Sequence, residues 1–220
     1  MSARLAVFDC DGTLVDGQAD ICLTMVEAFK RASLTPPDPN DVRRIVGLSL
    51  PVAIRHLAPD LDEAQTRSVV EYYKSGYFAR RQEGLLREPL YDGIADLLGN
   101  LRASGWTLAV ATGKSDRGLA AVLAAHGLTD LFTSLQTADR HPSKPHPAML
   151  EAALFEAGAQ PADAVMIGDT SFDMQMAGAA GVRAVGVAWG YHPPEELRAT
   201  GAADVAHKVA DLSDMLERVL

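Results

Sequence analysis

Short runs of apolar residues recur along the chain, and stretches with helical spacing of apolar positions separate them. The runs predict strands at residues 4–8, 106–112, 131–137, 164–169, 183–189 and 203–207. Apolar positions three and four residues apart predict helices at residues 115–126, 147–157 and 211–220. Strands that alternate with helices in this way predict an α/β fold in which a parallel sheet is flanked by helices.

One long segment interrupts this alternation. Almost a hundred residues without a convincing strand separate the first predicted strand from the second. Within this segment, Leu50, Ile54 and Leu57 have the spacing of one apolar helix face, and Ser49 is a suitable N-cap for that helix. A connection between a strand and the next helix needs far less chain. We therefore expect an all-helical domain at residues 17–89, inserted into a core formed by residues 1–16 and 90–220.

Composition and charge narrow the classes of partner. No apolar run approaches the roughly 20 residues of a membrane span, and the N-terminal residues lack the apolar region of a signal peptide. These features favour a cytoplasmic protein that does not use a membrane. A formal net charge of −9 argues against binding to nucleic acid through a basic surface. It still permits a small phosphorylated metabolite as the ligand.

Polar residues gather where the predicted strands end. In parallel α/β sheets, ligands bind outside the carboxyl ends of the strands, so side chains at these ends are expected to converge. A single aspartate after a strand is usually a turn residue, but an ordered series at successive strand ends is harder to attribute to chance. The residues concerned are Asp9, Asp11, Thr112, Gly113, Lys114, Lys144, Asp169 and Asp173.

The carboxylates in this set predict a metal site. Asp9 and Asp11 lie two residues apart, and like charges this close cost free energy unless a cation or a shared proton is present. Asp9, Asp169 and neighbouring oxygens offer the hard ligands that Mg²⁺ prefers. Asp173 is expected beside them, where it orients Lys144 or a metal-bound water.

The same residues are suited to phosphoryl transfer. One carboxylate can act as a nucleophile and form an aspartyl-phosphate, and a second can protonate the leaving oxygen and later activate water. Lys144 would bridge the nucleophile and the phosphate as a fixed positive charge. The Thr112 hydroxyl and the Gly113 amide would hold the phosphate oxygens.

Four segments resemble, in order, the motifs of haloacid-dehalogenase-like hydrolases: DCDGTLVDG at 9–17, ATGKS at 111–115, SKPHP at 143–147 and GDTSFDM at 168–174. The chain is most similar to the phosphoglycolate-phosphatase-like members. The resemblance implies a Rossmann-like core with a small, mobile helical cap. Gly113 departs from the pattern, because asparagine is frequent at that position.

The resemblance also implies roles for individual residues. Asp9 would be the nucleophile and a Mg²⁺ ligand, and Asp11 the general acid/base, with its backbone carbonyl also on the metal. Asp169 would complete the protein ligands, and Asp173 would support the metal site. Thr112 and Lys144 would bind the phosphate.

Other activities use the same fold or the same intermediate. A dehalogenase is disfavoured because that class lacks an acid at the position of Asp11. A sugar phosphomutase shares the aspartyl-phosphate and the general acid, and stays open as an alternative. A pyrophosphatase and a binding protein without catalysis are weaker alternatives.

The inserted segment is expected to choose the substrate. Within RRIVGLSL, residues 43–50, Gly47 permits close approach of the backbone, and Arg43 or Arg44 is a candidate for binding a substrate carboxylate. Two helices joined by a turn, with both arginines in solvent, explain the segment equally well. Whether the chain is a monomer or a homodimer stays open.

Overall fold

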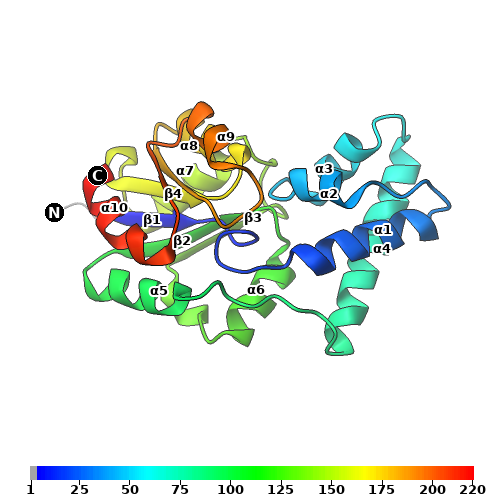
Figure 1. Cartoon of the computed structure of the whole chain (residues 1–220), viewed down its shortest axis with the longest axis horizontal. Helices are drawn as coiled ribbons and strands as arrows, with labels where there is room; N and C mark the ends of the chain where they lie inside the picture. The colour runs from blue at the N-terminus through cyan, green and yellow to red at the C-terminus, as the bar shows by residue number, and fades with distance from the viewer. Residues whose placement is uncertain (1–3) are drawn as a thin grey trace.

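A computed structural model describes residues 4–220, and its centre is one parallel sheet (Figure 1). The sheet has the strand order β3-β2-β1-β4-β5-β6, and every neighbouring pair is parallel. This is the order of a doubly wound Rossmann sheet, so the expected fold class is confirmed. The strands are β1 (Leu5–Phe8), β2 (Thr107–Thr112), β3 (Ser134–Thr137), β4 (Ala164–Gly168), β5 (Arg183–Val187) and β6 (Asp204–Ala206).

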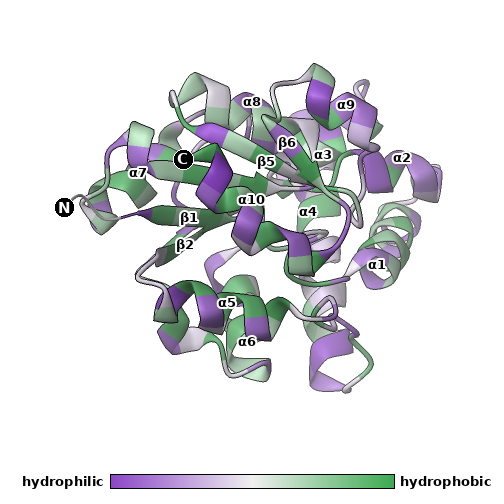
Figure 2. Ribbon diagram, turned by 60° about the vertical axis from the view of Figure 1, so that its left-hand side comes forward, coloured by the Kyte–Doolittle hydropathy of each residue, from purple (hydrophilic) through white to green (hydrophobic). Residues whose placement is uncertain are grey.

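Helices cover both faces of the sheet. One apolar cluster joins alternate strand residues to α5 (Ile94–Ala103), α6 (Asp116–Ala125) and α10 (Leu212–Val219). A second cluster joins the opposite face to α7 (Ala148–Ala157), α8 (Ser171–Ala179) and α9 (Pro194–Ala199). Figure 2 shows the hydrophobic strands between these two layers. Burial on both faces explains why the strands are continuous apolar runs rather than alternating ones.

The remaining helices form a separate group between β1 and α5. They are α1 (Gln18–Arg31), α2 (Pro39–Arg44), α3 (Leu50–Leu57) and α4 (Glu63–Gln82). We call this group the cap; in Figure 1 it lies beyond one end of the sheet. It has its own apolar cluster, which includes Met25, Phe29, Ile54 and Val69. The boundaries expected from the sequence, at residues 16/17 and 89/90, stay a prediction.

The ends of the cap helices follow from local hydrogen bonds. The Asp62 carboxylate accepts a bond from the Gln65 amide, and the Gln65 side chain accepts one from the Asp62 amide, so a capping box begins α4. Ser49 is the N-cap of α3, as expected, but its side chain makes no capping bond. Its amide instead donates to the Ser143 hydroxyl of the core, at 2.8 Å.

Short 3₁₀ helices occupy three loops: Thr129–Leu131, Pro161–Asp163 and Val209–Asp211. Because the 3₁₀ helix Thr129–Leu131 comes first, β3 begins at Ser134 and not at the predicted residue 131. No helix among residues 4–220 combines the length and the apolar character that crossing a bilayer requires.

A buried ion pair joins the two long cap helices. Asp20 of α1 is 5% exposed, and its carboxylate binds the Arg80 guanidinium of α4 and the Arg87 amide at 2.7 Å. Asp20→Ala would leave Arg80 unpaired in a mostly buried position, so we expect a loss of about 3 kcal/mol in unfolding free energy. Urea unfolding measures this loss.

Glu63→Ala is the matched control, because Glu63 pairs with Arg67 on the exposed face of α4. Exposed pairs of this kind contribute under about 0.5 kcal/mol. Equal losses in the two variants would show that the Asp20 pair is no stronger than a surface pair.

Candidate active site

Three aspartates meet where β1 and β4 end. Asp9 directly follows β1 and continues its ladder, with its amide bonded to the Ile167 carbonyl at 2.9 Å. Asp169 follows β4, and Asp173 lies in the first turn of α8. All three are completely buried, and one oxygen of each lies within 4.8 Å of the others. The convergence expected from the strand ends is therefore present in the structure.

Asp173 connects the start of α8 to a buried lysine. Thr170 is the N-cap of α8, and its amide and hydroxyl donate to Asp173 Oδ2 at 3.1 and 2.7 Å. The Lys144 ammonium donates to Asp173 Oδ1 at 2.6 Å and lies 2.9 Å from Asp9 Oδ1. Lys144 is 1% exposed. Its charge is thus fixed between the two carboxylates.

Asp169 is held from both sides. Its Oδ1 accepts a bond from the Thr13 hydroxyl at 2.9 Å, and its Oδ2 accepts one from the Tyr191 amide at 2.9 Å. Two glycines make this possible, because a Cβ on Gly12 or Gly190 would lie 2.1 Å from an atom of the Asp169 side chain. Gly12 also has a φ of +84°, which favours glycine.

The three carboxylates outnumber the positive charge among them. Burial raises the pKa of Asp9 to about 7, with the Lys144 charge opposing the shift and the Asp173 charge adding to it. Burial, with the charges of Asp9 and Asp173, also raises the pKa of Asp169 well above its usual value. Fully ionised, these aspartates and Lys144 carry a net charge of −2, since three negative charges face one positive charge.

Asp9 shows where a cation fits. Its Oδ2 is buried and has no hydrogen-bond partner among residues 4–220, and its Oδ1 meets only the Lys144 ammonium, at 2.9 Å. A buried carboxylate with so few partners is costly. A divalent metal ion would supply the missing positive charge, and carboxylate oxygens are the ligands that hard cations take. The aspartate cluster could therefore hold a metal.

Asp11 faces a different partner. Its Oδ1 lies 3.0 Å from the Lys114 ammonium, and that ammonium donates to Glu88 Oε1 at 2.7 Å. Burial raises the pKa of Asp11, and the Lys114 charge opposes the shift. Asp11 therefore combines a buried carboxyl group with a directly contacting cation, Lys114.

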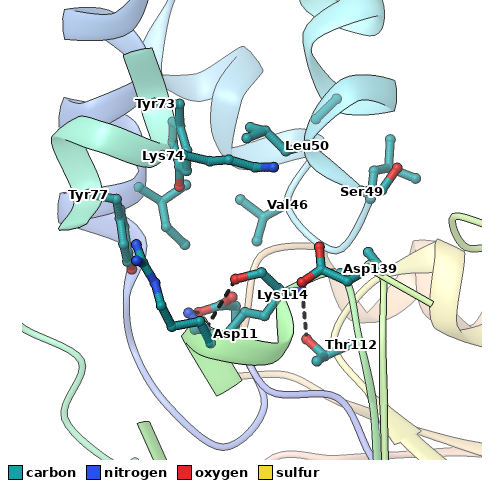
Figure 3. A pocket seen from close by; sticks show the side chains of 18 of the residues that line it. Asp11, Val46, Ser49, Leu50, Tyr73, Lys74, Tyr77, Thr112, Lys114 and Asp139 are labelled. Atoms are coloured by element: carbon teal, nitrogen blue, oxygen red, sulfur yellow. Dashed lines mark hydrogen bonds and ion pairs between the residues drawn. The ribbon is translucent and has the colours of Figure 1, made fainter. Parts of the chain in front are cut away.

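A cavity of about 930 Å³ lies between this end of the sheet and the cap. Figure 3 shows Asp11 and Thr112 on its core side and Tyr73, Lys74 and Leu50 on its cap side. Asp9, Gly113, Lys114 and Gly47 also line it. The cavity is large enough for a small organic ligand. Its walls combine an ionic floor with a cap surface that is partly apolar and aromatic and also carries Lys74 and Arg81.

The cap backbone rests directly on Gly113. A Cβ there would lie 2.6 Å from the Gly47 carbonyl oxygen and 2.7 Å from that of Leu48. Gly47 itself has a φ of +102°, so both sides of this contact use a glycine. The contact gives a physical reason for glycine at position 113.

The arginines of α2 lie on another side of the cap. Arg43 donates to the Gly190 carbonyl at 3.2 Å, and Arg44 pairs with Glu196 at 2.7 Å. Both line a second hollow of about 380 Å³, against the loop after β5. The structure does not place Arg43 among the residues that line the main cavity.

Several residues of the site were not assigned a role from the sequence. Thr13 and Lys114 stand inside motifs that were visible, but their partners are distant in the chain. The sequence carries no signal for the contacts of the Glu88 side chain and the Tyr191 backbone amide, because only the folded chain brings them to Lys114 and Asp169.

Comparisons with known proteins identify relatives of this chain. The family model of haloacid dehalogenase-like hydrolases matches residues 6–187. The probable phosphatase IndB of Dickeya dadantii is 36% identical, over 89% of this chain and 85% of its own. The phosphoglycolate phosphatase of Colwellia psychrerythraea is 30% identical, over 90% of each chain.

A solved structure shares the whole architecture. The crystal structure of a predicted phosphatase from Clostridium acetobutylicum superposes with a TM-score of 0.87, at 26% identity, over 99% of this chain and 100% of that one. The family match covers well over half of the chain. The chain therefore belongs to the haloacid dehalogenase-like hydrolases.

Proposed function

We propose that this protein is a magnesium-dependent phosphatase that hydrolyses a small phosphate monoester through an aspartyl-phosphate on Asp9. The observation that carries the proposal is the state of Asp9. Its carboxylate is buried and lines the cavity, its Oδ1 lies 2.9 Å from the Lys144 ammonium, and its Oδ2 has no hydrogen-bond partner among residues 4–220. Such a carboxylate is available to a metal and to a phosphorus atom.

The residues present fit Mg²⁺. Asp9, Asp169 and the backbone carbonyl of Asp11 would hold the ion, and Asp173 would support the site through Lys144. When bound, Mg²⁺ reduces the repulsion between the Asp9 carboxylate and the phosphate dianion. Thr13 and the Tyr191 amide already orient Asp169 for this role.

The reaction divides into two displacements at phosphorus. An Asp9 oxygen attacks phosphorus, the bond from phosphorus to the ester oxygen breaks, and Asp11 gives that oxygen a proton. Water then attacks the phosphorus of the aspartyl-phosphate and gives a proton to Asp11. Inorganic phosphate leaves and Asp9 is restored.

Other residues hold the transferred group. The Thr112 hydroxyl, the Gly113 amide and the Lys144 ammonium would bind the equatorial phosphate oxygens, where charge is spread in the transition state. Closure of the cap over the bound substrate would exclude bulk water while Asp9 attacks phosphorus.

Phosphoglycolate is the first substrate to test, because a curated relative that is 30% identical bears the name phosphoglycolate phosphatase. The apolar cap wall with Tyr73 and Tyr77 also permits esters with a larger leaving group. A small phosphorylated metabolite is therefore the proposed partner.

One prediction of this mechanism concerns the nucleophile. Asp9→Asn keeps the size of the side chain but removes the attacking anion, so Mg²⁺-dependent phosphate release from phosphoglycolate and 4-nitrophenyl phosphate should fall at least about 10³-fold. Asp60→Asn, an exposed aspartate of the cap, is the control and should retain activity. Retained turnover in Asp9→Asn would contradict the aspartyl-phosphate mechanism.

A second prediction links metal binding to pH. Asp9 has an unfolded pKa of 3.8 and a folded, metal-free pKa of about 7. Without metal, its contribution to stability is therefore greatest at low pH and is lost as pH rises through about 7. Mg²⁺ binds the ionised form, so its stabilising effect should be larger at pH 8 than at pH 5.

Thermal unfolding measures this effect with Mg²⁺ or with a chelator. At 100 times the dissociation constant, Mg²⁺ should raise the melting temperature at pH 8 by roughly 5–10 °C for a chain of this size. The rise at pH 5 should be much smaller. An equal rise at both pH values would show that the ion does not bind the Asp9 carboxylate.

A third prediction concerns the contact between the cap backbone and Gly113. Gly113→Asn would force the cap backbone at Gly47 and Leu48 away from the core. Displacements of about 1 Å can cost around 10² in rate, so kcat/KM should fall about 10²-fold. Gly99→Ala is the matched control, because a Cβ at Gly99 meets nothing within 4 Å. Unchanged kinetics in Gly113→Asn would mean that the cap tolerates the displacement.

A further inference from the structure

A second charged cluster lies beside the aspartates, and the mechanism above uses only one of its members. It contains Asp11 and Glu88 with Lys114 and Arg81. The Lys114 ammonium is 3.0 Å from Asp11 Oδ1 and 2.7 Å from Glu88 Oε1, and Arg81 is 2.6 Å from Glu88 Oε2. The Lys114, Glu88 and Asp11 side chains are 8%, 9% and 11% exposed. Two negative charges thus face two positive charges in a mostly buried place.

Glu88 belongs to the segment that returns from the cap to the core. Its carboxylate binds two cap residues of α4, since the Tyr77 hydroxyl donates to Oε1 at 2.9 Å and Arg81 pairs with Oε2. Its backbone carbonyl contacts His126 Nε2, at the end of α6 in the core, at 2.8 Å. Glu88 therefore joins the cap to the core at this point.

The backbone of Lys114 is fixed by the core. Its amide donates to the Thr112 hydroxyl at 3.3 Å, and its carbonyl accepts from the Ala138 amide at 3.2 Å. The next residue, Ser115, caps α6. The ammonium is therefore delivered from a rigid turn to the space between Asp11 and Glu88, and the side chain has little freedom to leave it.

Asp11 depends on this ammonium for its orientation. Its Oδ1 is buried and accepts no properly directed hydrogen bond from residues 4–220, so the ion pair with Lys114 is its main restraint on that side. Without Lys114, the carboxylates of Asp11 and Glu88 would face each other, and like charges at short range repel. Asp11 would then turn away from its present position.

We propose that Lys114, itself held by Glu88, is a positioning residue that aims the Asp11 carboxyl group at the leaving oxygen of the substrate. This proposal rests on the proposed phosphatase function. Glu88 is also bound by Tyr77 and Arg81 of the cap. The orientation of the Asp11 carboxyl group therefore depends on the packing of the cap against the core. Lys114 does not touch the phosphate in this role.

The test compares two esters of similar shape. Phenyl phosphate has a poor leaving group that needs a proton, whereas 4-nitrophenyl phosphate has a good leaving group that needs little help. The values of kcat/KM report the steps up to the aspartyl-phosphate. Lys114→Met should lower kcat/KM for phenyl phosphate by about 10²-fold or more and for 4-nitrophenyl phosphate by less than about 10-fold.

Two further variants separate positioning from general damage. Lys114→Arg keeps the charge. It should bring the ratio of the kcat/KM values for the two esters most of the way back to that of the wild type. Glu88→Gln loosens the ammonium and should shift the ratio in the same direction as Lys114→Met, by a smaller factor. Lys30→Met removes an exposed lysine of α1 and should leave the ratio unchanged.

The outcomes are distinct. If Lys114→Met lowers kcat/KM for both esters by the same factor, or lowers neither, the positioning role is overturned while the phosphatase function stands. A wild-type protein that releases no phosphate from either ester or from phosphoglycolate would overturn the proposed function and, with it, this proposal. A shifted ratio that Lys114→Arg restores would support both.

Discussion

Three carboxylates buried around one ammonium form the constraint on which the rest of the structure depends. Asp9 and Asp169 can meet only because β1 and β4 are parallel neighbours that end at the same edge of the sheet. Asp173 reaches them because α8 begins directly beyond β4. Crowding at this edge leaves no room for side chains on the adjacent backbone, and a Cβ on Gly168 would lie 2.4 Å from the Asp173 carboxyl carbon.

Charge balance distinguishes the two ionic clusters of the site. The cluster of Asp9, Asp169, Asp173 and Lys144 has a deficit of positive charge when ionised. The cluster of Asp11, Glu88, Lys114 and Arg81 is balanced. An unbalanced buried cluster favours a bound cation, whereas a balanced one holds its members in a fixed geometry. Asp9 and Asp11, the proposed nucleophile and acid/base, therefore sit in different electrostatic surroundings although they are only two residues apart.

The sequence was sufficient for the sheet and for the floor of the site. Apolar runs located all six strands, and their alternation with helices gave the parallel sheet. Residues at strand ends could be assigned because topology alone brings such ends together. The all-helical segment could be recognised by its length and spacing, but its packing on the core could not. The contact of Glu88 with Lys114 depends on how the cap packs on the core, and the contact of Tyr191 with Asp169 depends on how two core loops fold together. Local patterns encode neither.

Arg43 and Arg44 illustrate the limit most clearly. Their charge predicted a contact with a substrate carboxylate, but charge does not tell which face of a short helix will meet the core. In the structure, Arg43 binds the Gly190 carbonyl and Arg44 binds Glu196, while the Arg44 carbonyl contacts His192 Nε2 at 3.0 Å. These contacts tie the cap to the loop after β5.

Contacts on two sides of the cavity thus hold the cap on the core. The contacts of α2 with the loop after β5 hold one side, and Glu88 with Lys114 holds the other. Between them, the Gly47–Leu48 backbone rests on Gly113. The wall between these anchors carries Tyr73, Leu50 and Lys74, whose side chains face the cavity. In the proposed phosphatase, recognition of the leaving group would depend on this mixed aromatic, apolar and cationic wall more than on the two arginines of α2.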